Sequence, residues 1–195
     1  NGIDTSEWNP ANDATLPNHY DIDSLDAKRG NKRALQIELG LEVDAARPLL
    51  GMVSRIGEQK GSDLLVELLP QLLDRGVQLA VLGSGDKTLE QALLDAAARA
   101  PQQLAVCIGY NEGLAHRIEA GSDMFLMPSR FEPCGLNQMY SMRYGTPPIV
   151  HATGGLRDTV CDPMAAQLDE ATGFAFDSPD AASLLAAVDR ALALW

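Results

Sequence analysis

Cysteine, aromatic residues and positive charge are all scarce in this chain of 195 residues. Its three cysteines, Cys107, Cys134 and Cys161, are odd in number and far apart in the sequence. They cannot form a fully paired disulfide framework within the chain, and they lack the spacing of zinc ligands. We therefore expect a reducing compartment. Cys134 fits either a small apolar filler or an exposed thiol beside a ligand.

Basic residues are too few for a nucleic-acid or anionic-membrane surface, because 15 Lys and Arg face 27 Asp and Glu and the formal net charge is −12. No apolar run approaches the roughly 20 residues of a membrane span, and no segment resembles a signal peptide. The three histidines, His19, His116 and His151, are not clustered, so we predict no metal site. An anion site in this chain must rely on locally concentrated positive charge.

From residue 47 onward, short apolar runs alternate with longer amphipathic ones. The short runs predict strands at residues 49–53, 78–82, 104–108, 124–127, 148–151 and 174–176. The longer ones predict helices at residues 63–75, 87–99, 114–120, 136–144 and 181–194, with a kink at Pro70. This alternation predicts a parallel, doubly wound α/β sheet, Rossmann-like in type, with ligands beyond the carboxyl ends of its strands.

The first part of the chain has a different character. It is polar and rich in turn residues up to about Gly30, and a short helix is predicted at residues 31–39. We interpret residues 1–46 as a linker and lead-in segment that packs on a domain formed by residues 47–195. The chain starts without Met, and its first residues are of types common in turns. We therefore expect it to be a piece of a longer protein.

The most informative segment is residues 128–138, PSRFEPCGLNQ, which follows the apolar run at 124–127. A strand, a tight turn and a helix start in succession point backbone N–H groups at an anion. Glu132 is out of place beside a phosphate alone. It fits a ligand whose phosphate meets the helix start while another group, such as sugar hydroxyls, meets the carboxylate.

Two cations follow the first predicted strand. Arg55 and Lys60 flank a loop that contains glycine, and Ser62-Asp63 then predicts an N-cap for the next helix. Together they are suited to a diphosphate, with Arg as a bidentate donor and Lys as a point charge. A solvated surface pair fits the same pattern.

Weaker signals follow the next two strands. Gly83 and Gly85 have the spacing of the first two glycines of a dinucleotide fingerprint, but Thr88 stands where the third glycine belongs, so a tight turn explains them equally well. Tyr110 is placed to stack on a purine, with ordinary packing as the alternative.

Three segments in the same order resemble one known family: residues 54–61 (SRIGEQKG), 128–138 and 153–160 (TGGLRDTV). They are similar to the second half of bacterial glycogen synthases and plant starch synthases, and residues 1–4 look like the linker into that half. The resemblance implies a GT-B fold, in which two Rossmann-like halves face each other across a cleft. It also implies a retaining glycosyltransferase that moves glucose from ADP-glucose to the non-reducing end of an α-1,4-glucan.

The resemblance also implies a role for each matching residue. Arg55 and Lys60 match residues that hold the ADP phosphates, Tyr110 one that lies against adenine, and Gly83 one near the nucleoside. Glu132 faces the donor sugar, where a carboxylate stabilises oxocarbenium character. The sugar-binding set is Glu132, Pro133, Cys134 and Gly135. Leu136 and Asn137 are expected at the phosphate.

The resemblance implies neither a cofactor nor a metal, and the glucan acceptor is expected on a missing amino-terminal half. This chain alone is therefore expected to be inactive. Cytoplasm is the implied location, or the plastid for a plant protein. Many GT-B transferases carry a second Glu where this chain has Tyr140, which leaves the ribose contacts open.

Two other functions remain compatible with the sequence. One is another GT-B transferase, such as a sucrose synthase-like enzyme or a mannosyltransferase. The other is a Rossmann-like module that binds a nucleotide without catalysis. Titration of the chain with ADP and with NAD separates the two functions, because a dinucleotide-binding module should prefer NAD.

Overall fold

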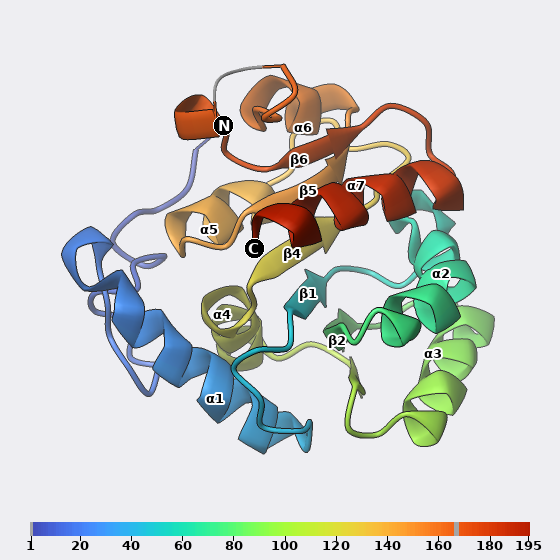
Figure 1. Cartoon of the computed structure of the whole chain (residues 1–195), viewed down its shortest axis with the longest axis horizontal. Coiled ribbons are helices and arrows are strands. Elements are labelled where there is room, and N and C mark those ends of the chain that lie inside the picture. The colour runs from blue at the N-terminus through green and yellow to red at the C-terminus, as the bar shows by residue number, and fades with distance from the viewer. Residues whose placement is uncertain (1, 166–167) are drawn as a thin grey trace.

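A single parallel sheet forms the centre of the computed structural model, which describes residues 2–165 and 168–195 (Figure 1). Its six strands pair in the order β3-β2-β1-β4-β5-β6. The strands are β1 (Leu49–Val53), β2 (Gln78–Gly83), β3 (Leu104–Ile108), β4 (Met124–Met127), β5 (Pro148–His151) and β6 (Phe174–Phe176). Every neighbouring pair is parallel. The predicted doubly wound, Rossmann-like α/β fold is confirmed, and the strands lie where the apolar runs placed them.

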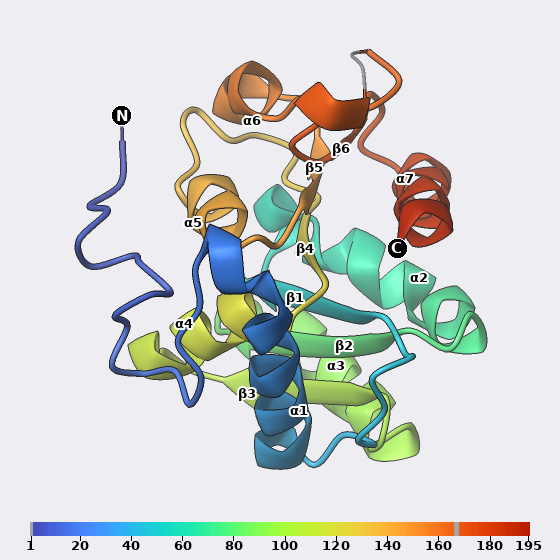
Figure 2. The same cartoon turned by 60° about the vertical axis from the view of Figure 1, so that its left-hand side comes forward.

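Helices cover both faces of the sheet. The helices are α1 (Lys28–Leu39), α2 (Ser62–Asp74), α3 (Lys87–Arg99), α4 (Glu112–Gly121), α5 (Asn137–Arg143), α6 (Gly154–Thr159) and α7 (Ala181–Leu194). Three 3-10 turns accompany them: η1 (Ile22–Ala27), η2 (Glu58–Lys60) and η3 (Leu168–Glu170). Helices α2, α3 and α7 lie on one face, and α1, α4, α5 and α6 on the other (Figure 2).

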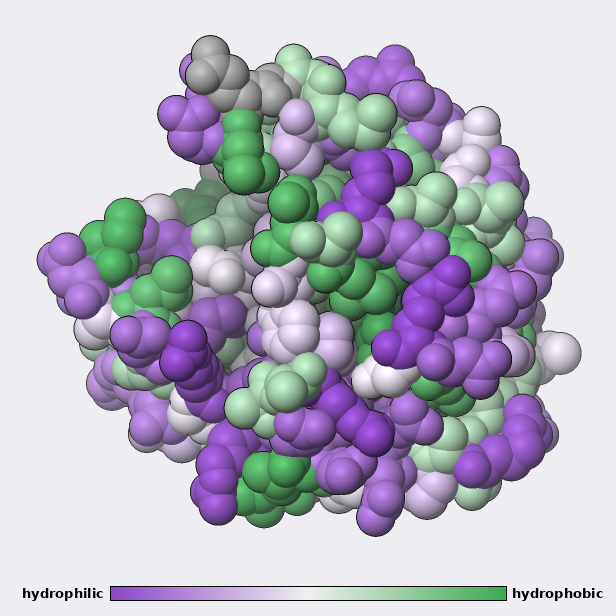
Figure 3. All heavy atoms as spheres, in the orientation of Figure 1, coloured by the Kyte–Doolittle hydropathy of each residue, from purple (hydrophilic) through white to green (hydrophobic). Residues whose placement is uncertain are grey.

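Side chains alternate between the two faces along each strand, so each face of the sheet has its own hydrophobic core. On β4, Met124 and Leu126 join the core beneath α2, α3 and α7, while Phe125 and Met127 join the core beneath α1, α4 and α6. Strands buried on both faces are apolar at nearly every position, so they form nearly continuous apolar runs in the sequence. Hydrophilic side chains cover most of the face shown in Figure 3, with hydrophobic ones among them in scattered groups.

The lead-in segment is more ordered than its polar composition suggests. Irregular structure was predicted up to about Gly30, but η1 begins at Ile22 and α1 at Lys28. Asn31 explains part of this, because its side-chain amide donates to the carbonyl of Asn18 (2.8 Å) and accepts from the Asn18 N–H (3.1 Å). Residue 1 of the proposed linker lies outside the described residues.

The predicted N-cap of α2 was wrong. The N-cap is Gly61, with φ 72°, and its Cβ position lies 2.2 Å from the carbonyl oxygen of Pro128, so only glycine fits there. Ser62 is instead inside the helix, and its Oγ accepts the N–H of Gly57 (3.0 Å). Pro70, where a kink was predicted, lies inside the helix, which extends to Asp74.

Candidate functional site

The carboxyl ends of β1 and β4 meet at the centre of the sheet, where the strand order reverses. The chain leaves β1 toward α2 on one face and leaves β4 toward α5 on the other, which opens a crevice between the two loops. A cavity of about 270 Å³ lies there. It is lined by Met52, Val53, Ser54, Arg55, Lys60, Leu126, Met127, Ser129, Glu132, Gly135, Leu136 and Asn137.

Lys60 and Glu132 form an ion pair in this cavity, between Nζ and Oε2. Lys60 comes from η2 after β1, and Glu132 from the loop after β4. Glu132 is 9% exposed, and Ser129 Oγ donates a second hydrogen bond to its carboxylate (3.3 Å). The structure therefore brings together the cation and the carboxylate that the sequence nominated separately. Lys60 has three N–H donors, so pairing with Glu132 leaves others available.

Arg130 ties the two loops together beside this pair. Its guanidinium donates to both carboxylate oxygens of Asp63 (2.7 and 2.6 Å) and to the Glu58 carbonyl (2.6 Å), and its backbone N–H donates to Gln59 (2.9 Å). Burial acts to raise the pKa of Asp63, but the hydrogen bonds and charge of Arg130 outweigh it and lower that pKa. Asp63, predicted as a cap, thus fixes the loop that carries Lys60.

Two glycines at the start of α6 hold the loop that carries Glu132. A Cβ on Gly154 falls 2.2 Å from the Glu132 carbonyl oxygen, and one on Gly155 falls 2.0 Å from that of Cys134. The Gly155 N–H also donates to the Glu132 carbonyl (3.1 Å). The two glycines therefore allow the backbone of residues 132–134 to approach the start of α6 closely. Pro133 and Cys134 form this support and do not line the cavity.

The start of α5 closes another side of the cavity. Leu136 is the N-cap and makes no side-chain capping bond, while its carbonyl accepts the N–H groups of Met139 (2.8 Å) and Tyr140 (3.0 Å). Asn137 donates its side-chain amide to the Val53 carbonyl at the end of β1 (2.7 Å). That bond commits one of the two amide hydrogens expected at a phosphate and ties α5 to β1. Gly135 turns the chain into the helix with φ 71°.

Arg55 lies at the rim of the cavity. Its side chain is exposed and donates to Gln59 Oε1 (3.2 Å). It is free to reach an anion with its remaining N–H groups, and it lies on the same loop as Lys60.

Gly83 and Tyr110 lie outside the lining of this cavity. A Cβ on Gly83 falls 1.8 Å from the Ser54 carbonyl oxygen, and Gly85 has the same relation to Ile56 (2.0 Å), so these glycines let the loops after β1 and β2 run side by side. That packing accounts for both glycines without a ligand. Tyr110 is 86% exposed, which rules out ordinary core packing for its ring.

Ser54, Ser129 and Arg130 belong to the site but were not among the predicted site residues. Ser54 and Ser129 are polar residues just beyond the ends of β1 and β4, a position that could have nominated them. Arg130, also just beyond the end of β4, could have been nominated on the same ground, but no local pattern predicts its pairing with Asp63, 67 residues away.

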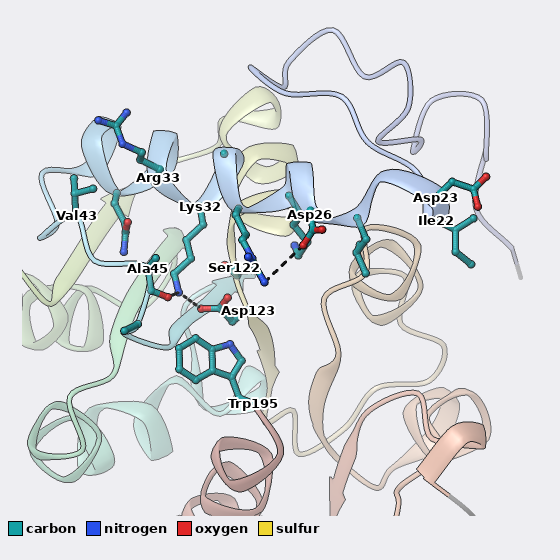
Figure 4. A pocket seen from close by; sticks show the side chains of 17 residues that line it. Ile22, Asp23, Asp26, Lys32, Arg33, Val43, Ala45, Ser122, Asp123 and Trp195 are labelled. Carbon is teal, nitrogen blue, oxygen red and sulfur yellow. Dashed lines mark hydrogen bonds and ion pairs between the residues drawn. The ribbon is translucent and has the colours of Figure 1, made fainter.

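A larger groove of about 1110 Å³ lies beside α1, at the end of the sheet where β1 and β4 begin (Figure 4). The ion pair of Lys32 and Asp123 (2.7 Å) lies in it, with Lys32 Nζ 4.8 Å from the centre of the Trp195 ring. Asp123 also accepts the N–H of Leu49 (2.7 Å), at the first residue of β1. None of the predicted site residues lines this groove.

Within residues 2–165 and 168–195, no group of three or more His, Cys, Asp or Glu side chains could hold a metal ion. His151 lies between the carbonyls of Ser129 (2.8 Å) and Asp177 (3.2 Å), and His116 contacts Asp13 (2.7 Å). Over the same residues, none of the helices is long and apolar enough to cross a membrane.

Comparison with known proteins places these features in a family. Residues 40–195 match the family described as Glycosyl transferases group 1. One curated relative, the glycogen synthase of Aromatoleum aromaticum, is 58% identical to this chain, and the match covers 100% of this chain and 40% of the relative. Another, the glycogen synthase of Dechloromonas aromatica, is 54% identical, and the match covers 100% of this chain and 41% of the relative. The chain thus spans about two fifths of the length of these relatives.

Solved structures agree with the sequence comparison. The catalytic domain of starch synthase IV from Arabidopsis thaliana, bound to ADP and acarbose, matches with a TM-score of 0.93 and 37% identity, over 100% of this chain and 41% of that one. Sucrose-phosphate synthase from Thermosynechococcus elongatus matches with a TM-score of 0.64 and 26% identity, over 82% of this chain and 39% of that one. The fold is that of one Rossmann-like half of a GT-B glycosyltransferase, and the chain belongs to the glycosyl transferases group 1 family.

Proposed function

We propose that this chain is the donor-binding half of a retaining α-glucan synthase that transfers glucose from ADP-glucose to the non-reducing end of an α-1,4-glucan. The observation that carries the proposal is the Lys60–Glu132 pair in the cavity between β1 and β4, with Arg55 at its rim. Cations for a diphosphate and a buried carboxylate for a sugar thereby share one site.

Arg55 and Lys60 are assigned to the diphosphate. Lys60 reaches a phosphate oxygen with the N–H groups that Glu132 leaves available, while the exposed Arg55 closes over the diphosphate from the rim. As the bond to glucose breaks, negative charge grows on the leaving diphosphate, and both cations stabilise it. Leu136 and Asn137 add the backbone N–H groups at the start of α5. This charge balance needs no metal and no cofactor.

Glu132 is assigned to the donor sugar. The anomeric carbon acquires oxocarbenium character as the leaving group departs, and a buried carboxylate nearby stabilises that charge. Gly154 and Gly155 hold the loop formed by Glu132, Pro133, Cys134 and Gly135 in place for this task. The ion pair with Lys60 keeps the carboxylate oriented toward the cavity.

Tyr110 is assigned to the adenine. Its exposed ring follows β3, two strands from the cavity, and offers an aromatic face to a base that leads away from the diphosphate. Gly83 is the last residue of β2, the strand between β3 and β1, and it supplies a tight turn beside the nucleoside.

ADP-glucose and an α-glucan are the preferred substrates because the curated relatives are glycogen synthases and the starch synthase structure is bound to ADP and acarbose. Sucrose-phosphate synthase is a more distant relative of this chain, at 26% identity. The acceptor binds a second half that is not part of this chain. We assign the protein to the cytoplasm, or to the plastid if its source is a plant, with neither nucleic acid nor a membrane as partner.

Calorimetric titration of the chain with ADP and with NAD tests the proposal. A charge-assisted contact contributes about 1.5–3 kcal/mol, so Arg55→Ala and Lys60→Ala should each weaken ADP binding by roughly ten- to a hundredfold. Arg99→Ala, which removes an exposed positive charge at the far end of α3, is the matched control and should bind ADP like the unmodified chain. Unchanged affinity in both site variants places the phosphates elsewhere, and a preference for NAD supports a dinucleotide-binding module.

A further inference from the structure

Trp8, in the lead-in segment, lies flat between two rings from different helices. Its indole stacks on His116 of α4 with ring centroids 3.8 Å apart and planes 17° apart. On its other side the indole stacks on Tyr140 of α5, with ring centroids 3.6 Å apart and planes 9° apart. Figure 2 shows the amino-terminal trace running beside α4 and α5 on that face of the sheet. One side chain near the start of the chain therefore joins two helices more than a hundred residues away.

Other contacts from the same segment converge on α5. Arg143 Nε donates to the Trp8 carbonyl (3.4 Å), and the hydroxyl of the fully buried Tyr144 donates to Asp13 (2.5 Å). Tyr20 donates its hydroxyl to the Tyr144 carbonyl (2.7 Å), just beyond the last residue of the helix. The lead-in segment thus contacts α5 along its middle and at its carboxyl end.

Helix α5 depends on such support because it has only seven residues. A helix of two turns is unstable by itself in water, so tertiary contacts decide whether and where it forms. Its first residue, Asn137, and its N-cap, Leu136, line the cavity between β1 and β4. A displacement of α5 therefore moves one wall of that cavity.

We propose that Trp8 and Tyr140 are positioning residues for the nucleotide-sugar site, which hold α5 and the loop before it in the geometry that the ligand needs. The inference rests on the proposed function for the identity of the ligand. The linkage between Trp8 and α5 does not depend on that identity. Tyr140, where the sequence suggested a missing ribose contact, acts through the stack with Trp8.

Hydrogen exchange in the chain without ligand tests the linkage first. Trp8→Leu removes the aromatic stack at a partly exposed position, and it should speed exchange of the backbone amides of residues 137–144 by about tenfold or less, the equivalent of a lost aromatic pair. Trp8→Phe keeps an aromatic face and should restore much of the protection. Leu185→Ala is the matched control, because it truncates a partly buried side chain on α7, across the sheet. Unchanged exchange in α5 of Trp8→Leu, or equally fast exchange in the control, overturns the inference.

Titration with ADP then tests the consequence for the site. Trp8→Leu should weaken ADP binding by roughly three- to tenfold, with partial recovery in Trp8→Phe and no change in Leu185→Ala. Equal affinities of Trp8→Leu and the unmodified chain overturn the positioning role. If the unmodified chain binds no ADP, the proposed function fails, and the exchange experiment still decides whether Trp8 holds α5.

Discussion

Glu132 meets its positive partner, Lys60, from a segment 72 residues away in the chain. Its carboxylate accepts hydrogen bonds from Lys60 and Ser129, and it lies five positions before the first residue of α5. A carboxylate whose only task was to complement the dipole of that helix is expected within its first turn. The environment of Glu132 therefore favours a part in the chemistry over a part in helix stability.

Replacing Glu132 by Gln in the full-length enzyme tests this assignment. The variant keeps the shape of the side chain and loses the charge that faces the sugar, so kcat should fall by about 10²–10³, equivalent to roughly 3–4 kcal/mol, with little change in the donor KM. Steady-state kinetics and a melting curve provide the two measurements. Near-normal turnover with a lower melting temperature contradicts the catalytic role.

A second buried carboxylate, Glu119 on α4, makes stability depend on pH. It is 1% exposed, and its Oε2 has no hydrogen-bond partner among the described residues. Burial raises its pKa well above the usual value, and the charge of Lys28 offsets this only in part. The folded state then holds a proton that the unfolded state releases above about pH 4.5, so stability falls as pH rises from there toward the raised pKa.

Glu119→Gln should remove that pH dependence. Between pH 5 and 7 the native chain loses about 1.4 kcal/mol for each pH unit in which only the folded state holds the proton, and the variant should not show this loss. The pKa of Lys28 is lowered by burial to about 7 and changes stability mainly above this window. Denaturant unfolding at both pH values measures the difference, with the exposed Glu67→Gln as the control. Parallel pH profiles for the native chain and Glu119→Gln contradict the prediction.

At the scale of elements, the site is a junction of loops that glycines allow to touch. The start of α6 packs against the backbone of residues 132–134, and the loop after β1 packs against the loop after β2. These approaches leave no room for a side chain. The position of Glu132 therefore depends on α6, an element that does not line the cavity.

Gly155→Ala tests this dependence. Its Cβ would lie 2.0 Å from the Cys134 carbonyl oxygen, whereas ordinary contacts begin near 3.4 Å, so the loop must move by about 1 Å or more. A displacement of that size should weaken ADP binding or lower kcat by about tenfold or more. Gly113→Ala in α4 is the control, because the nearest atom to its Cβ is at the flexible end of Arg117, at 3.2 Å, and the next two lie at 3.8 Å, an ordinary contact distance. Normal ADP affinity and turnover in Gly155→Ala would show that α6 does not set the geometry of the loop.

At the scale of the whole molecule, the proposed donor site is a cavity of about 270 Å³ between β1 and β4. The chain also spans only about two fifths of the glycogen synthases that it matches. A GT-B reaction takes place between two halves, so we expect the acceptor site and part of the catalytic environment to come from the other one.

The isolated chain should therefore bind ADP and transfer no glucose. Incubation with labelled ADP-glucose and glycogen, followed by measurement of label in the polymer, checks this directly. The full-length enzyme serves as the positive control under the same conditions. Incorporation by the isolated chain above the level of a Glu132→Gln variant contradicts the division of the site between two halves.

Sequence patterns predicted the sheet well because burial on both faces makes the strands mostly apolar. They also nominated six residues that line the cavity: Arg55, Lys60, Glu132, Gly135, Leu136 and Asn137. Their success has a physical basis, since side chains beyond the carboxyl ends of parallel strands converge at one edge of the sheet. Local rules failed at the start of α2, where the approach of Pro128 to Gly61 overrides the preference for a serine cap.

The sequence by itself determined the strands, the class of fold and the loops that carry charge, because these depend on local periodicity and on the order of elements. Only the tertiary structure decided which charges pair, as in Lys60 with Glu132 and Arg130 with Asp63, and that Trp8 stacks on Tyr140. Such contacts join residues about 70 to 130 positions apart, and no local pattern encodes their distance. They exist because the sheet brings its loops to one edge and because the lead-in segment folds back over α4 and α5.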